Sequence, residues 1–214
     1  MGLSELTGGD DVARAAVKMI QQAVGKVSQV TAMAVAQAEK LKADDTMNPA
    51  GKARLLDELP NNLEAGTYAL HSNVESAIAV LEARLTSVAL AHDSTPAADA
   101  AIRDELSHYV AAIKPTDAHL TLVQLAANSR YSTMLAGPYG ESLAARFQID
   151  PASLKRAALQ TVAQSGTPTQ KAAAAGLGKL HKATRVHALS KAGTQNAVRS
   201  IRESKQTQRE QRPQ

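Results

Sequence analysis

The sequence predicts an all-α protein: an elongated antiparallel helical bundle with long heptad-patterned helices and a basic C-terminal helical arm. Strand signals are nearly absent, because the chain has no alternating β-branched runs and no Asn-Gly or Asp-Gly hairpin. Apolar residues instead follow a 4–3 spacing from position 13 to position 41. Helix starts are marked by prolines that follow capping or polar residues: Pro49 after Asn48, Pro96 after Thr95, Pro115 after Lys114, Pro151 after Asp150 and Pro168 after Thr167.

The first predicted helix covers about residues 11–43. Its apolar positions repeat every four and three residues over four heptads, which is the pattern of a coiled-coil seam. We therefore predict that this face packs against other helices or against copies of the chain. The seam residues are Val17, Ile20, Val24, Val27 and Leu41.

The next predicted helices are a short one over 49–59, stopped by Pro60, and a long one over 62–92. Further helices are predicted over the ranges 96–114 and 116–135. A turn at 137–140 and a short helix carrying Leu143 and Phe147 complete the predicted bundle, whose connections are short.

The chain changes character after residue 150. Residues 1–150 hold 12 Lys/Arg and 18 Asp/Glu, a net charge of −6, whereas residues 151–214 hold 12 Lys/Arg and 2 Asp/Glu, a net charge of +10. We predict an acidic bundle body over 1–150 and a basic helical segment over 151–192, formed by helices 151–164 and 168–192. The segment 193–214 contains few aliphatic residues, and we predict a flexible tail there because burial would not offset its ordering entropy.

Helix starts inside the basic segment carry their own signals. Asp150 precedes Pro151, and Thr167 stands three residues before Gln170, which fits a capping box. On a helix beginning near Pro168, several cations fall within about a third of the circumference. We predict that the basic arm binds an anionic partner through Lys171, Lys179, Lys182, Arg185, Arg199, Arg202, Lys205 and Arg209.

No residue pattern indicates catalysis, a metal site or a cofactor. The six histidines form no H-x-x-x-H pair, and we expect them at the surface or at its boundary. Gly176-Leu177-Gly178-Lys179 lacks the spacing of a phosphate-binding loop, and no G-x-S-x-G elbow occurs. We expect no catalytic residue, no metal ligand, no cofactor and no small-molecule substrate.

We expect neither a membrane span nor a secretory signal peptide. The most apolar window, residues 19–38, contains four glutamines and one lysine. The first residues form neither a basic n-region nor an apolar h-region. The chain has no cysteine, which excludes disulfides and thiolate metal sites. We expect a soluble, cytoplasmic protein.

The Ala- and Gln-rich helices, the heptad seam and the basic C-terminal segment together resemble structural and assembly proteins of tailed bacteriophages. These include scaffolding proteins, connector or adaptor proteins and internal virion proteins. In scaffolding families a basic C-terminal segment binds the coat protein while upstream helices oligomerise. The resemblance implies a non-enzymatic virion component, located in the virion or in the host cytoplasm during assembly. Its partners would be copies of itself, other virion proteins such as capsid or portal, and DNA.

The basic arm also leaves a second hypothesis open. A cellular helical protein that binds nucleic acid through the arm has the same charge pattern, because Lys and Arg contact phosphates without reading sequence. The arm has no aromatic residue, so stacking on single-stranded bases is not expected.

Overall fold

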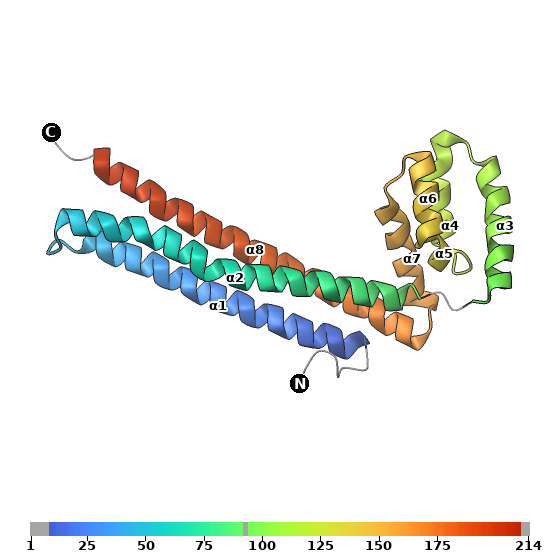
Figure 1. Cartoon of the computed structure of the whole chain (residues 1–214), viewed down its shortest axis with the longest axis horizontal. Helices are drawn as coiled ribbons and strands as arrows, with labels where there is room; N and C mark the ends of the chain where they lie inside the picture. Colours follow the sequence, from blue (N-terminus) through green and yellow to red (C-terminus); the bar gives the residue numbers. More distant parts are fainter. Residues whose placement is uncertain (1–8, 92–93, 211–214) are drawn as a thin grey trace. The chain divides into compact units, whose positions relative to one another are not determined.

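The computed structural model describes residues 9–91 and 94–210, with the side chains of residues 14–91 and 94–203. Every regular element in this described part is helical, which confirms the all-α class. Within it, no helix is both long and apolar enough to cross a membrane. The elements are α1 (Gly9–Ala43), α2 (Pro49–Ala89), α3 (Pro96–Ala112), η2 (Pro115–Asp117), α4 (Ala118–Ala126), α5 (Ser132–Leu135), α6 (Pro138–Phe147), α7 (Pro151–Ser165) and α8 (Pro168–Glu210) (Figure 1).

The predicted capping residues cap their helices. The side-chain oxygens of Asn48, Thr95 and Asp150 accept hydrogen bonds from backbone N–H groups two or three residues ahead, at 2.9, 3.3 and 3.0 Å. Thr167 and Gln170 form the predicted capping box: the backbone N–H of each donates to the side chain of the other. These contacts satisfy N–H groups that have no partner within the first turn.

The prediction that Pro60 ends a short helix is wrong, because α2 continues through Pro60 to Ala89. Proline removes one helical hydrogen bond and crowds the preceding turn, at a cost of about 3 kcal/mol. Leu56, Leu59 and Leu63 are buried on either side of Pro60. Burial of these leucines is the compensation that the local sequence does not reveal.

The predicted helix 116–135 is divided in the structure into η2, α4 and α5. The division lies at Asn128, whose side chain accepts a hydrogen bond from the backbone N–H of Arg130 at 3.0 Å. The backbone carbonyl of Asn128 also accepts from the N–H groups of Tyr131 and Ser132. Asparagine favours such turns because its short side chain replaces a backbone partner.

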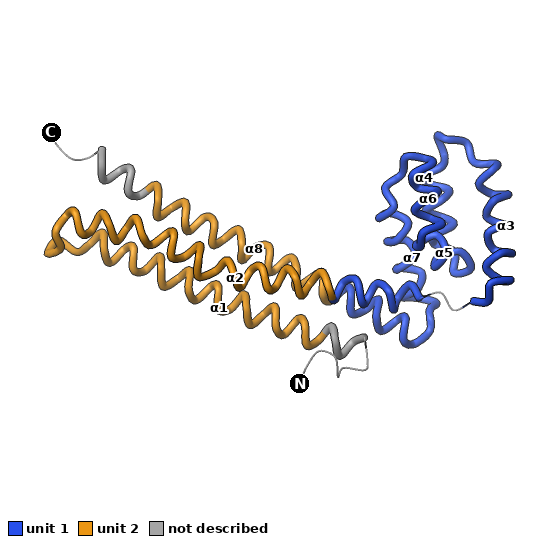
Figure 2. Tube along the Cα trace, in the orientation of Figure 1, with its two compact units in different colours: residues 1–13, 81–178 blue, residues 14–80, 179–214 orange. Residues whose placement is uncertain are grey.

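The chain divides into two compact units, each made of separate stretches of sequence (Figure 2). Unit 1 comprises residues 1–13 and 81–178, and unit 2 comprises residues 14–80 and 179–214. This division differs from the sequence-based boundaries at residues 150 and 192. The reason is that α2 and α8 each contribute to both units.

Unit 1 contains a compact core formed by the short helices α3 to α7. This core includes Met134 and Leu135 of α5 and Tyr131 of the turn before it. Buried residues of α3, α4, α6 and α7 complete it. Phe147 and Tyr139 are partly buried against this cluster. The left-handed residue Gln148, at φ 56°, then ends α6.

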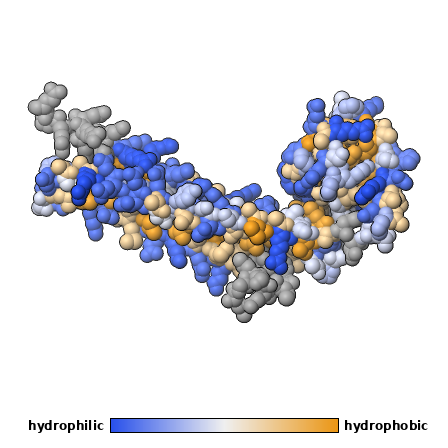
Figure 3. All heavy atoms as spheres, viewed as in Figure 1, coloured by the Kyte–Doolittle hydropathy of each residue, from blue (hydrophilic) through white to orange (hydrophobic). Residues whose placement is uncertain are grey.

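Unit 2 consists of α1 with parts of α2 and α8, which lie side by side (Figure 1). One of its core clusters contains Ala38 and Leu41 of α1, Leu56 and Leu59 of α2, and Ile201 of α8. Exposed apolar side chains occur along these helices among hydrophilic ones (Figure 3). The buried apolar side chains of unit 2 are leucine, valine, isoleucine and alanine, without a buried Phe or Tyr among those described.

The predicted flexible tail covers residues 193–214, of which the structure describes residues 193–210. Helix α8 continues to Glu210, so residues 193–210 are helical. Val198 and Ile201, two of the few aliphatic residues in this segment, are both 3% exposed. Their spacing of three residues places them on one face of the helix. Two well-buried anchors therefore order a segment whose average composition predicts disorder.

Two separate polar contacts join the helices of unit 2. His71 of α2 and His187 of α8 are 7% and 4% exposed, and their ring nitrogens Nδ1 and Nε2 lie 3.0 Å apart. The expectation of surface histidines is therefore wrong for these two. The hydroxyls of Thr31 and Thr194 meet at 3.3 Å and join α1 to α8. A hydrogen bond between two imidazoles requires one nitrogen to accept, so at least one ring is neutral.

Acidification is expected to destabilise unit 2 through this pair. Burial lowers the pKa of His71 and of His187 below the ordinary value of 6.5; Lys191 lowers both further, while Glu75 opposes the shift. Below pH 6.5 the unfolded chain therefore binds more protons than the folded chain, and the free energy of unfolding falls as the pH drops towards the folded-state pKa. Urea unfolding followed by circular dichroism at about pH 7.5 and about pH 5 measures this loss.

The variant His187→Gln is expected to unfold with a shallower pH dependence over the same range, because glutamine keeps a hydrogen-bonding group and does not titrate. His181→Gln, on the exposed side of the same helix, is the matched control and should retain the wild-type slope. An unchanged slope in His187→Gln would assign the acid sensitivity to other groups.

Two glycines in helices are expected to respond in opposite ways to alanine. A Cβ at Gly66 in α2 meets no atom within 4 Å, so Gly66→Ala should raise the free energy of unfolding by about 1 kcal/mol through helix propensity. A Cβ at Gly140 in α6 would overlap the backbone of Leu135, so Gly140→Ala should destabilise unit 1 strongly. Urea denaturation of both variants checks the pair, and equal effects would contradict it.

Candidate partner-binding surface on α8

The structure separates the predicted cations of the basic arm into three groups. Lys179, Lys182, Arg185, Arg199 and Arg202 belong to unit 2 and are exposed. Lys171 is also exposed but belongs to unit 1. The side chains of Lys205 and Arg209 lie outside the described residues, although the backbone of both is helical. The structure thus brings most of the predicted cations onto one helix of one unit.

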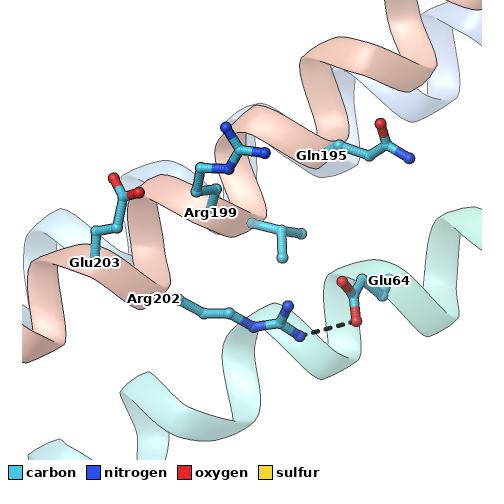
Figure 4. Close-up of a pocket in the computed structure, with 6 residues that line it drawn as sticks. Glu64, Gln195, Arg199, Arg202 and Glu203 are labelled. Carbon is cyan, nitrogen blue, oxygen red and sulfur yellow. Dashed lines mark hydrogen bonds and ion pairs between the residues drawn. The ribbon is translucent and has the colours of Figure 1, made fainter.

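Some positive charge on α8 is neutralised by α2. Arg202 lies 3.0 Å from a carboxylate oxygen of Glu64 and 3.3 Å from the side-chain oxygen of Asn61. Figure 4 shows Arg202 extended towards Glu64, whereas Arg199 is directed away from it. Lys191, which the sequence analysis did not single out, lies 2.6 Å from Glu75. Such exposed ion pairs contribute little to stability, about 0–1 kcal/mol each, but they orient α8 against α2.

Three of the other exposed cations of α8 form the candidate binding surface, and Lys179, which has an interaction within the protein, is not one of them. Lys182, Arg185 and Arg199 are exposed, and no carboxylate among the described side chains forms an ion pair with any of them. The side chains of α8 that face the core, such as Leu180 and Ala183, are buried on the other side of the helix. A helix anchored in this way presents its cations at fixed spacing, and they are able to bind carboxylates or phosphates.

The outward face of α8 also carries exposed aliphatic side chains. Val186 is 49% exposed and Leu189 is 73% exposed. With Lys182 and Arg185 they follow an i, i+3, i+4, i+7 spacing, so all four lie on one face. We call these four residues the 182–189 strip. The cations of the strip were predictable from the charge pattern of α8, but its aliphatic residues were not, because the apolar pattern alone does not reveal which apolar positions face solvent.

An open groove of roughly 370 Å³ lies between α2 and α8. Tyr68, His71, Glu75 and Lys191 contribute to its walls. The Lys191 ammonium donates a hydrogen bond to Glu75 and holds the pKa of that carboxyl below its usual range. Among the described residues, no three His, Cys, Asp or Glu side chains gather closely enough to hold a metal ion. We assign the charged pair in this groove to the contact between α2 and α8.

The predicted seam of α1 lies against the other helices of its own unit. Ile20, Val27 and Leu41 are buried, and Val17 and Val24 are half-buried. The seam residues therefore pack within the chain. A charged substitution at Val24 or Val27 would therefore destabilise unit 2, and a resulting loss of self-association could not be assigned to a lost contact between copies.

A charged cluster in unit 1 links α3 to the turn before α5. The Tyr131 hydroxyl donates to Glu105 at 2.5 Å, and Arg130 lies 2.7 Å from the same carboxylate. The hydrogen bond from Tyr131, followed by the charge of Arg130, holds the pKa of Glu105 below its usual range. The same hydrogen bond raises the pKa of Tyr131 to about 12, which keeps the phenol protonated at neutral pH. The cluster holds two elements of unit 1 together.

Comparison of the chain with protein-family models, with curated proteins and with solved structures returned no match.

Proposed function

We propose that this protein is a non-enzymatic structural or assembly protein that docks on an anionic macromolecular surface through α8. The observation that carries the proposal is the set of exposed cations on α8, Lys182, Arg185 and Arg199, that the chain leaves without a partnering carboxylate among its described side chains. Keeping such charges on a helix that is otherwise anchored in the core favours a binding role over a solubilising one.

Several features support a structural role rather than turnover. The ionisable clusters near α8 and in unit 1 are ion pairs and hydrogen bonds between helices, such as Glu75 with Lys191 and Glu105 with Tyr131. These groups are held in charge states that strengthen the contacts between helices. The groove between α2 and α8 is open, and the charged pair on its walls, Lys191 with Glu75, joins the two helices.

The resemblance to helical proteins of tailed bacteriophages extends the proposal to a virion component. In that role the long helices form an elongated antiparallel bundle, and the basic C-terminal helix is the docking arm. Its partners are further copies of the chain, other virion proteins such as capsid or portal, and packaged DNA. Because the seam on α1 packs within unit 2, contacts between copies are proposed to use other faces.

Neutralising the exposed cations of α8 should weaken binding to anionic partners. We expect the triple variant Lys182→Gln, Arg185→Gln, Arg199→Gln to bind duplex DNA, polyglutamate, or both more weakly than wild-type protein. On DNA, the slope of log K against log salt should become shallower by about 0.9 for each phosphate that the variant no longer neutralises. Fluorescence anisotropy across a salt series measures both quantities, and light scattering on the same samples reports oligomeric state.

The matched control removes three positive charges from unit 1. Arg84→Gln, Arg103→Gln and Lys114→Gln change three exposed cations of unit 1 and should leave binding at the wild-type level. Point substitutions are preferable to removing residues 151–214, because deletion of α8 would expose the core around Val198 and Ile201. If the α8 variant binds as tightly as the control, or if wild-type protein binds neither probe, the proposal is overturned.

A further inference from the structure

We propose that the 182–189 strip is a docking site for an acidic amphipathic helix of a partner protein. This inference rests on the proposed function, because it specifies the class of anionic partner that the same helix binds. It follows from the combination of cationic and aliphatic side chains on one face of α8 and from the rigidity of that face.

The strip is held in place by the opposite side of the helix. Leu180, Ala183 and His187 are 0%, 7% and 4% exposed and pack into unit 2. The hydrogen bond between His187 and His71 fixes the rotation of α8 at the level of the strip. A partner therefore meets a preformed surface and does not have to order it, which reduces the entropic cost of binding.

The aliphatic residues of the strip identify the chemistry of the partner. Leu189 lies four residues from Arg185, and Val186 lies four residues from Lys182, so charge and apolar surface meet along the same two turns. Leucine and valine gain free energy only when apolar groups cover them. A helix that carries aliphatic residues on one stripe and Asp or Glu beside it satisfies both kinds of side chain together.

The shape of α8 beyond Leu189 suits a helical partner. Gly193 follows Leu189 by one turn, and a Cβ at this glycine would meet no atom within 4 Å. The helix backbone at Gly193 is therefore not covered by a side chain of its own, and the exposed Leu189 lies one turn before it. A side chain from a partner helix is able to lie over Gly193 and against Leu189, in the way that knobs enter holes between packed helices.

Two other occupants fit the strip less well. A nucleic acid would engage Lys182 and Arg185 through its phosphates but would leave Val186 and Leu189 against a charged backbone, with no gain from burial. A second copy that used the same strip across a two-fold axis would place Lys and Arg close to Lys and Arg. Like charges in such contact oppose association.

A synthetic helical peptide tests the inference directly. The probe is a fluorescent peptide of about three heptads with leucine at the a and d positions and glutamate at the flanking positions. We expect full-length protein to bind it, and to bind a scrambled peptide of the same composition much more weakly. The variant Leu189→Gln should lower the affinity about tenfold, because it removes one apolar anchor while leaving every charge in place.

The control variant changes another exposed leucine, in unit 1. Leu120 of α4 is 62% exposed, and Leu120→Gln should bind the peptide as wild-type protein does. Circular dichroism of both variants should match the wild-type spectrum, since both leucines are at the surface. Binding of Leu189→Gln at the wild-type level would overturn the inference.

The outcomes separate this inference from the proposed function. If duplex DNA or polyglutamate binds and the helical peptide does not, α8 has an anionic partner but the strip does not select a helix, and only the inference falls. If the scrambled peptide binds as well as the amphipathic one, binding depends on charge alone. The inference then fails and the proposed function stands. If none of the probes binds, both proposals fall.

Discussion

The packing of α8 against α1 and α2 is the contact on which unit 2 depends. Helices α1 and α2 form two sides of a core of leucine, valine, isoleucine and alanine, and α8 supplies the third side. Val198 and Ile201 close one end of this core, and Leu180 and Ala183 pack further along. Helix α8 is therefore part of the folded core of unit 2, although its composition is that of a basic arm.

Polar contacts in unit 2 help to set how its three helices are aligned. Alanine side chains specify the axial register of packed helices only weakly, because they are small and fit several alignments at a similar free energy. The pairs His71–His187 and Thr31–Thr194 match only at one alignment of the three helices. We attribute the alignment of unit 2 to these pairs, in the same way that a single buried polar residue sets the register of a coiled coil.

Local features of the fold were predictable from the sequence, whereas features set by tertiary packing were not. The caps at Asn48, Thr95, Asp150 and Thr167 depend on neighbours within three residues, and each acts as expected. The continuity of α2 through Pro60 and of α8 beyond residue 192 depends on leucines, valines and isoleucines meeting across the bundle. The same limit applies to the candidate site. The cations of α8 were visible in its charge pattern, but Leu189 was not, because its exposure follows from which face the bundle covers.

The two faces of α8 couple partner binding to folding. One face contributes buried residues to unit 2, and the opposite face carries the 182–189 strip, so any partner that binds the strip binds only a chain in which α8 is docked. Binding of this kind stabilises the folded state by RT ln(1 + [L]/Kd), which reaches about 2.7 kcal/mol at a partner concentration of one hundred times Kd. That gain is a substantial part of the about 5–15 kcal/mol typical of folded proteins. The proposed docking of a partner helix on the strip would therefore make the protein more stable when that partner is present.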